Sequence, residues 1–235
     1  MENDNPVSDK WHIDIEFVEY GDIYFFYKPK REVEKVEGID SVSRFYFVLD
    51  PEPADSPARY IILGNKKMPT FTDGGKTTWG FVQIVGGRGF KTNKNQTNTR
   101  VKNASRPAGE GIYAIIEHRN HTHLLYALEL PDKLGPVQDA FNIKKEANYI
   151  FLQRTTDISP QSPEEPFSNF INVNKEDLNK RGTEILLVGV EGDIGRLGVS
   201  VNKEKETLVS ADIFSSLGVD SRRHPLNSLI RGEWK

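Results

Sequence analysis

The sequence predicts an α+β protein built mainly of antiparallel β-sheet with a few short helices. Most apolar runs are short, are rich in Tyr, Phe, Ile and Val, and end at Gly, Pro or charged residues, as strands do. Few segments have the i, i+3, i+4 spacing of an amphipathic helix. A chain of 235 residues, 37% of them hydrophobic, is also long enough to bury a substantial core.

The expected elements follow one another along the whole chain. In the first half, apolar runs between turn-forming residues predict strands at 11–20, 22–28, 43–49, 59–63 and 79–85. In the second half, they predict strands at 111–117, 122–130, 148–154 and 184–190. Pro136 is a helix start signal and predicts a short helix at 137–141, with other short helices at 175–181 and 212–217.

A weak internal repeat suggests two related β-rich halves. The dipeptide Ile-Tyr occurs at 23–24 and 112–113, and Tyr-Ile occurs at 60–61 and 149–150, with a shift of 89 residues in both cases. Duplication of a β-rich unit explains this pattern, and so does chance in a chain biased toward strand-forming residues.

The same pattern suggests where the chain divides. We expect an N-terminal half at 1–86, a basic linker or loop rich in Gly, Asn, Lys and Thr at 87–108, and a C-terminal half with its tail at 109–235. The segment 157–167 holds three prolines and is also expected to be an exposed loop.

Composition excludes several classes of function. The net charge of −3 favours neither nucleic acid nor an anionic membrane as a partner. The absence of cysteine excludes disulfides and thiolate chemistry, and it is compatible with a cytoplasmic location. No run approaches the roughly 18–20 apolar residues that a membrane helix needs, and the N-terminus lacks the features of a signal peptide.

Three histidines make the most conspicuous candidate site. If Arg119 and Asn120 form a two-residue turn, His118 and His121 face each other across a hairpin, and His123 points to the same side. Three neutral imidazoles with an open position are typical of a catalytic zinc site. The alternative is that these histidines lie on a half-exposed strand and bind neighbouring groups or water.

A basic segment is the second candidate site. No acidic residue occurs between Asp73 and Glu110, whereas this region carries Arg88, Lys91, Lys94, Arg100, Lys102 and Arg106. Such a cationic segment binds phosphates through counterion release. It lacks the interleaved aromatic residues of single-strand binders, and a solvated loop explains it equally well.

Acid–base machinery has no local signature. Asp50 and Glu129 lie at matching points of the apparent repeat and would form a carboxylate pair if the halves faced each other. The aromatic runs at 24–27 and 45–47 are apolar on both faces, which indicates core packing, an oligomer interface or a ligand groove. Trp234 suggests that the tail docks on the body of the protein or on another subunit.

Several motifs resemble a conserved family of uncharacterised prokaryotic proteins. These are PAGEGIY at 107–113, HTHLLYALELP at 121–131, and the closing ADIF, HP and GEW at 211–214, 224–225 and 232–234. The resemblance implies a family-wide fold but no activity, cofactor or partner.

The leading interpretation is a cytoplasmic interaction or ligand-binding module without chemistry of its own, with a protein partner or a second copy as its target. The alternative is a metalloenzyme, a hydrolase, whose divalent metal is held by His118, His121 and His123. A third hypothesis is a nucleic-acid-associated protein that uses the basic segment.

Overall fold

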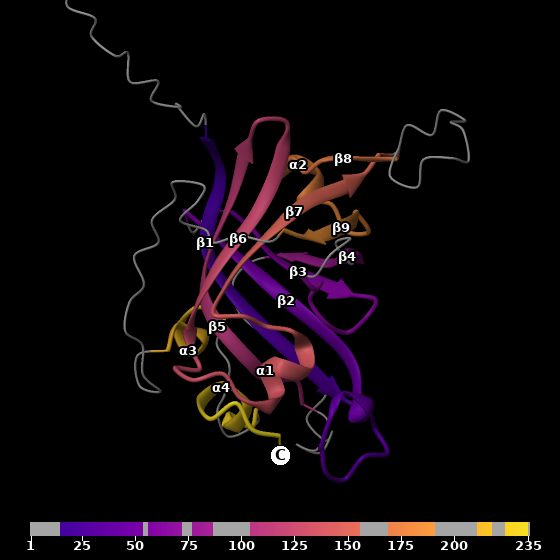
Figure 1. Ribbon diagram of the computed structural model, residues 1–235, viewed down its shortest axis with the longest axis vertical. Coiled ribbons are helices and arrows are strands. Elements are labelled where there is room, and N and C mark those ends of the chain that lie inside the picture. Colours follow the sequence, from indigo (N-terminus) through magenta and orange to yellow (C-terminus); the bar gives the residue numbers. More distant parts are fainter. Residues whose placement is uncertain are drawn as a thin grey trace, which may run out of the picture.

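The computed structural model describes residues 15–53, 56–71, 77–86, 104–155, 169–190, 211–217 and 224–234. Within these residues the chain forms one antiparallel sheet of nine strands, together with short helices (Figure 1). The strands are β1 (Ile15–Pro29), β2 (Val42–Glu52), β3 (Ala58–Leu63), β4 (Thr77–Gly86), β5 (Arg106–His118), β6 (His121–Leu130), β7 (Glu146–Arg154), β8 (Phe170–Asn172) and β9 (Glu184–Gly189). The helices are η1 (Ile39–Ser41), α1 (Pro136–Phe141), α2 (Lys175–Leu178), α3 (Asp212–Ser215) and α4 (Asn227–Ile230).

The sheet closes on itself. The strand order is β6-β5-β1-β2-β3-β4-β9-β7-β8, and β6 also pairs with β7, so that eight strands form a closed barrel. The short β8 pairs with the end of β7, beyond Ile150, the residue at which the pairing with β6 stops. The predicted class, mainly antiparallel sheet with few short helices, is therefore confirmed, and closure of the sheet is an additional feature.

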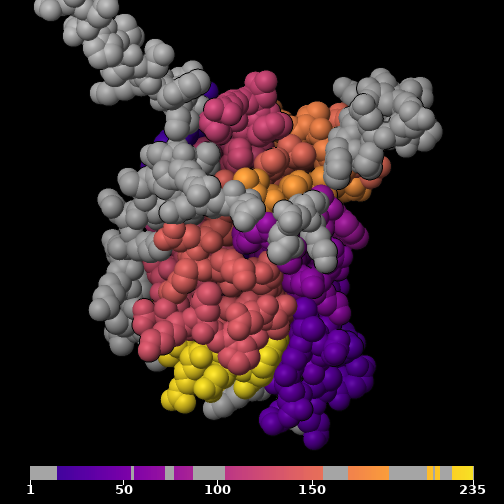
Figure 2. All heavy atoms as spheres, in the orientation of Figure 1, coloured from indigo at the N-terminus to yellow at the C-terminus, as the bar shows by residue number. Residues whose placement is uncertain are grey.

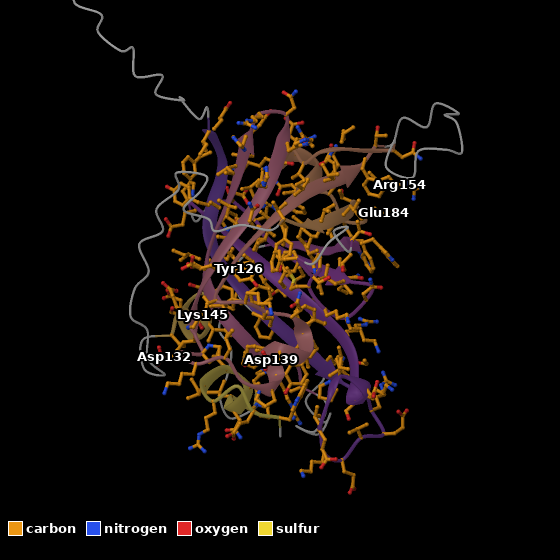
Figure 3. The ribbon with its side chains drawn as sticks, in the orientation of Figure 1. Tyr126, Asp132, Asp139, Lys145, Arg154 and Glu184 are labelled. Atoms are coloured by element: carbon orange, nitrogen blue, oxygen red, sulfur yellow. The ribbon has the colours of Figure 1, made fainter. Side chains whose placement is uncertain are left out.

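Aromatic and aliphatic side chains fill the interior of the barrel. Side chains on a strand alternate between two sides, and one set from every barrel strand forms a single buried cluster. Tyr126 lies near the middle of this cluster (Figure 3), with its ring 5.1 Å from Phe25 and 6.2 Å from Tyr149. The interior is a packed core.

The lower end of the barrel in Figure 1 is covered by α1 and the C-terminal tail. Phe141 of α1 stacks on Phe45 with the ring centroids 4.6 Å apart, and Trp234 packs against Phe141 at 5.5 Å. Gln138 of α1 donates to the carbonyl groups of Ala108 and Ser228, which joins α1 to β5 and α4. The expectation that the tail docks on the body of the protein is confirmed.

Strand β1 joins two segments that the sequence predicted as separate strands. Gly21 interrupts the apolar pattern but continues the strand, with a φ of +157°. A Cβ at Gly21 would lie 2.2 Å from the carbonyl oxygen of Asp50. Glycine is needed here because β2 approaches too closely for any side chain. The predicted start of this strand at 11–14 lies outside the described residues.

The two predicted halves contribute to one barrel. Strands β1–β4 come from 1–86 and β5–β9 from the rest of the chain, and the two groups pair through β1–β5 and β4–β9. The repeat finds no support in this arrangement. Tyr24 lies in the outer cluster whereas Tyr113 lies in the inner one, so the matching positions face opposite sides of the barrel wall.

Candidate functional site: the apolar outer face of the barrel

The three histidines lie together on the outer side of the β5–β6 hairpin. Arg119 and Asn120 form the two-residue turn, and His118 pairs with His121 as predicted. The rings of His118 and His123 are 5.9 Å apart. In the described part of the chain, however, no group of three or more His, Asp or Glu residues has a geometry that would hold a metal ion.

His123 has a structural partner. Its side chain is buried and its Nδ1 lies 2.9 Å from Oδ1 of Asn148 on β7. Burial lowers the pKa of His123, and the neighbouring His118 and His121 lower it further. The hydrogen bond to Oδ1 of Asn148 raises the pKa of His123 and places a proton on Nδ1, whereas burial has the larger effect and favours the neutral ring.

The basic segment lies mostly outside the described residues, which exclude Arg88, Lys91, Lys94, Arg100 and Lys102. Arg106, which the sequence placed in the loop, is the first residue of β5 and is only 8% exposed. The strand therefore begins two residues before the predicted end of the linker at 108.

The structure does not bring Asp50 and Glu129 together. Asp50 is on β2 and Glu129 is on β6, and β1 and β5 lie between these strands. The cross-strand partner of Asp50 is instead Asp22 on β1. The condition on which this carboxylate pair depended is therefore not met, because two strands separate Asp50 from Glu129 in the barrel wall.

At the end of the barrel that α2 covers, polar side chains inside the barrel form a network of hydrogen bonds. Arg59 forms two hydrogen bonds with the carboxylate of Glu19, and the Nη2–Oε2 distance is 2.7 Å. Tyr113 donates to Oε1 of Glu19 at 2.6 Å, and Nε of Arg59 donates to Oδ1 of Asn179 at 2.8 Å. This network is enclosed by protein and satisfies its own charges, so it is a part of the core.

Two rows of apolar side chains cross the outer face of four adjacent strands. In the first row Tyr24 of β1 pairs with Val48 of β2, Val48 with Tyr60 of β3, and Tyr60 with Ile84 of β4. The second row follows the same strands, with the cross-strand partners Phe26, Tyr46, Ile62 and Phe81 in that order. We call these eight residues together with Trp79 the outer band.

Exposure of the outer band increases from β1 to β4. Tyr24 and Val48 are fully buried, Tyr60 is partly buried, and Ile84 is 51% exposed. Trp79, on β4 beside the second row, is 54% exposed. The band is therefore covered on β1 and β2 and open to solvent on β4.

The covered part is occupied by the chain's own C-terminal segment. Ala211, Ile213, Leu217 and Leu229 form one buried cluster with the outer band on β1 and β2. Figure 2 shows part of this segment in yellow, next to the indigo N-terminal strands at the lower end of the molecule. The carboxylate of Glu110 accepts hydrogen bonds from the backbone N–H groups of Asp212 and Ile213, at 2.5 and 3.2 Å, and fixes the start of α3.

The open part has a fixed geometry at Trp79. A Cβ at Gly64 would lie 2.8 Å from Cε2 and Cζ2 of the Trp79 ring, so the indole lies directly against the glycine backbone. An aromatic ring held in this way loses little conformational freedom when a partner covers it. Trp79 is therefore preorganised although it is exposed.

Charged residues flank the outer band with opposite signs. Arg44 on β2 and Lys67 in the β3–β4 turn are exposed at the end nearest Trp79. Glu52, at the other end of β2, is also exposed. The cross-strand partner of Phe81 is Glu184 on β9, which forms an ion pair with Arg154 at 2.7 Å. Figure 3 shows the side chains of Arg154 and Glu184 at one edge of the barrel.

Carboxyl groups gather where α3 meets the barrel. Asp22 pairs with Asp50 across β1 and β2, and Tyr24 donates to Oδ2 of Asp22 at 3.3 Å. Burial, together with the charges of Asp212 and Asp50, raises the pKa of Asp22 to about 6. Docking of the C-terminal segment therefore opposes ionisation of Asp22.

Comparison with known proteins adds no relative. No family model, no curated protein and no solved structure matches this chain. None of the helices in the described part of the chain is long and apolar enough to cross a membrane.

Sequence reasoning identified part of the outer band. The aromatic runs at 24–27 and 45–47 were recognised as apolar on both faces, with an oligomer interface as one explanation. Trp79 and Ile84 were missed because both lie in the predicted strand 79–85, whose sequence has no pattern that distinguishes it from the other strands. Their common face with Tyr60 and Ile62 appears only when β3 and β4 are paired in register.

Proposed function

We propose that this protein is an interaction module that pairs with a second copy of itself through the open part of the outer band. The observation that carries this proposal is the gradient of exposure along the outer band, which ends on β4 with Ile84 and Trp79, each more than half exposed. Large contiguous apolar patches on soluble proteins usually mark interaction sites.

The composition of the patch supports an interface. Trp79 and Ile84 lie on one strand, and Tyr60, Ile62 and Phe81 lie beside them, partly exposed. Tryptophan and tyrosine are enriched among the residues that dominate binding energy, and truncation of such an anchor typically costs about 2 kcal/mol or more. The Arg154–Glu184 pair supplies a polar rim at the edge of the patch.

The distribution of charge favours a second copy as the occupant. The end of the face nearest Trp79 carries Arg44 and Lys67, and the opposite end carries Glu52. A twofold axis through the middle of the face would place the basic end of one copy on the acidic end of the other. Such an isologous contact is the commonest arrangement in soluble homo-oligomers.

The same symmetry matches the apolar anchors. Trp79 lies toward the Arg44 end of β4, and Ile84 lies toward the other end. The twofold rotation therefore brings Trp79 of one copy toward Ile84 of the other. A stable dimer buries about 800 Å² on each copy, so the interface includes the flanking charges as well as the apolar rows.

Sedimentation velocity of the full chain over a wide concentration range tests the proposal. We expect a concentration-dependent shift from monomer to dimer, and at least a tenfold weaker association for Trp79→Ser/Ile84→Ser. Ile171→Ser is the matched control, because Ile171 is also exposed (46%) but lies on β8, and it should leave association unchanged.

Charge reversal tests the symmetry itself. Arg44→Glu and Glu52→Arg should each weaken association, and the two changes in one chain should restore it, because every copy then carries the reversed pair. A protein that stays monomeric at all concentrations, or that associates equally well without Trp79 and Ile84, would overturn the proposal.

A further inference from the structure

The side chain of Arg106 is the most unusual buried charge in the structure. Arg106 is 8% exposed, and its Nε and Nη1 atoms are inaccessible to solvent and have no hydrogen-bond partner. Among the described residues, no carboxylate lies within ion-pair distance of this guanidinium. Arg59, a second arginine buried in the described part of the chain, is by contrast bonded to Glu19 and Asn179.

A buried guanidinium without an anion is energetically unfavourable. Removing a charged group from water costs far more than removing a neutral one, and arginine does not lose its proton to avoid that cost. Buried arginines are therefore paired with carboxylates or with anionic ligands. The protein needs a counter-anion at Arg106, and the described side chains supply none.

The surroundings of Arg106 form a junction of three segments. Arg106 is the cross-strand partner of Tyr27, whose hydroxyl lies 2.7 Å from Oγ of Ser228 and whose ring lies 5.4 Å from that of Trp234. The preceding residue, Ser105, accepts a hydrogen bond from Nδ1 of His224 at 2.7 Å. The C-terminal residues 224–234 thus contact β1 and the residue that precedes β5, on either side of Arg106.

We propose that Arg106 is the centre of a binding site for a small oxyanion, at the junction of β5 with the C-terminal residues 224–234. A planar guanidinium with five N–H donors suits the two oxygens of a phosphate or carboxylate group. Binding joins the C-terminal residues to β5, so it stabilises the docked tail. This site is separate from the outer-face pairing proposed above and does not depend on it.

Thermal unfolding of the full chain tests the site, with sodium phosphate titrated against chloride at constant ionic strength. We expect a saturable rise in the melting temperature of the wild-type protein and no such rise for Arg106→Met. Arg154→Met is the matched control, because Arg154 is half exposed and paired with Glu184, and it should keep the full response. Sodium acetate in place of phosphate distinguishes a carboxylate from a phosphate preference.

A second variant separates binding from folding. Arg106→Lys keeps the charge but loses the planar donor set, so we expect its apparent dissociation constant for phosphate to rise at least tenfold. In phosphate-free buffer, Arg106→Met should be at least as stable as the wild type, because it removes an uncompensated buried charge.

Three outcomes would overturn the proposal. They are a wild-type protein that responds to neither anion, a response that Arg106→Met retains, and a marked loss of stability in Arg106→Met without phosphate. The last result would mean that the chain itself already compensates the guanidinium. None of these readouts involves self-association, so failure here is distinguishable from failure of the proposed function.

Discussion

Arg59 and Glu19 form a buried ion pair inside the barrel, with both oxygens of the carboxylate bonded to the guanidinium and both side chains at most 1% exposed. Glu19 and Arg59 are 40 residues apart in sequence and lie on two different strands, β1 and β3. The pair fixes the register of β1 relative to β3, although β2 lies between these strands.

Removing one member of this pair should be strongly destabilising. In Arg59→Met the Glu19 carboxylate stays buried with Tyr113 as its remaining partner, and we expect a loss of about 3–5 kcal/mol in the free energy of unfolding. Glu19→Gln/Arg59→Met leaves no buried charge and should lose less than Arg59→Met alone. Urea unfolding followed by circular dichroism measures both values. A loss below about 1 kcal/mol for Arg59→Met would contradict this account.

Phe141 should be essential to the lower end of the barrel. Its ring stacks on Phe45 and contacts Tyr27 and Trp234, and Phe141→Ala should cost about 3–5 kcal/mol through lost burial and the resulting cavity. Trp234 should become more accessible to a fluorescence quencher at the same time. Ile171→Ala, on the exposed face of β8, should change stability by less than about 0.5 kcal/mol. Equal effects of the two changes would refute the packing argument.

Asp22 should make stability decrease with rising pH between about 4 and 6. Its pKa is raised from 3.8 to about 6 by burial and by Asp212 and Asp50, so the folded protein binds this proton more tightly than the unfolded chain does. Below pH 4 the carboxyl group is protonated in both states, so it does not lower the free energy of unfolding. Above pH 6 it is ionised in both states, and the decrease in the free energy of unfolding is complete. Because Asp22 is only partly buried, we expect this decrease not to exceed about 2 kcal/mol.

Asp22→Asn should remove this dependence. We expect the variant to be more stable than the wild type at pH 7 and equal to it near pH 4, measured by urea unfolding at several pH values. Asp132→Asn, an exposed carboxylate, serves as the control. A difference between wild type and Asp22→Asn that does not vary with pH would show that Asp22 is not the titrating group.

Gly64 should determine the position of Trp79. A methyl group at position 64 would lie 2.8 Å from the indole, so Gly64→Ala must displace the ring. We expect a change in the tryptophan emission spectrum and at least a severalfold weaker self-association, because the anchor is no longer preorganised. Gly38→Ala, where nothing lies within 4 Å, is the matched control. Unchanged emission and association in Gly64→Ala would contradict the proposed role of this glycine.

The strands were predictable because their chemistry is local. Each predicted strand lies in or overlaps an observed one, wherever the structure describes it, since β-branched and aromatic runs between turn residues favour extended backbone regardless of distant partners. The Arg119–Asn120 turn was a possibility that the sequence left open beside a four-residue turn, and the pairing of His118 with His121 decides for the two-residue turn. By contrast, β8 and α4 are too short and too weakly patterned to be recognised in the sequence.

The candidate site was predictable only in part. Period-two alternation correctly placed His118, His121 and His123 on one face, but it does not report whether their distances and partners suit a metal. Asp50 was paired with Glu129 by analogy between halves, whereas its neighbour is Asp22 in the adjacent strand. Which strands are neighbours is set by closure of the whole sheet, and a one-dimensional pattern contains no such information.

The sequence by itself determined the class of structure, because hydrophobic periodicity, turn residues and the scarcity of helical spacing act over a few residues at a time. The tertiary structure alone decided three things: the closure of the barrel, the joining of Trp79 and Ile84 to an apolar face that begins at Tyr24, and the burial of Arg106 at the start of β5. All three depend on contacts between residues far apart in the chain. Such contacts form only when loop-closure entropy is offset by packing of the complete core.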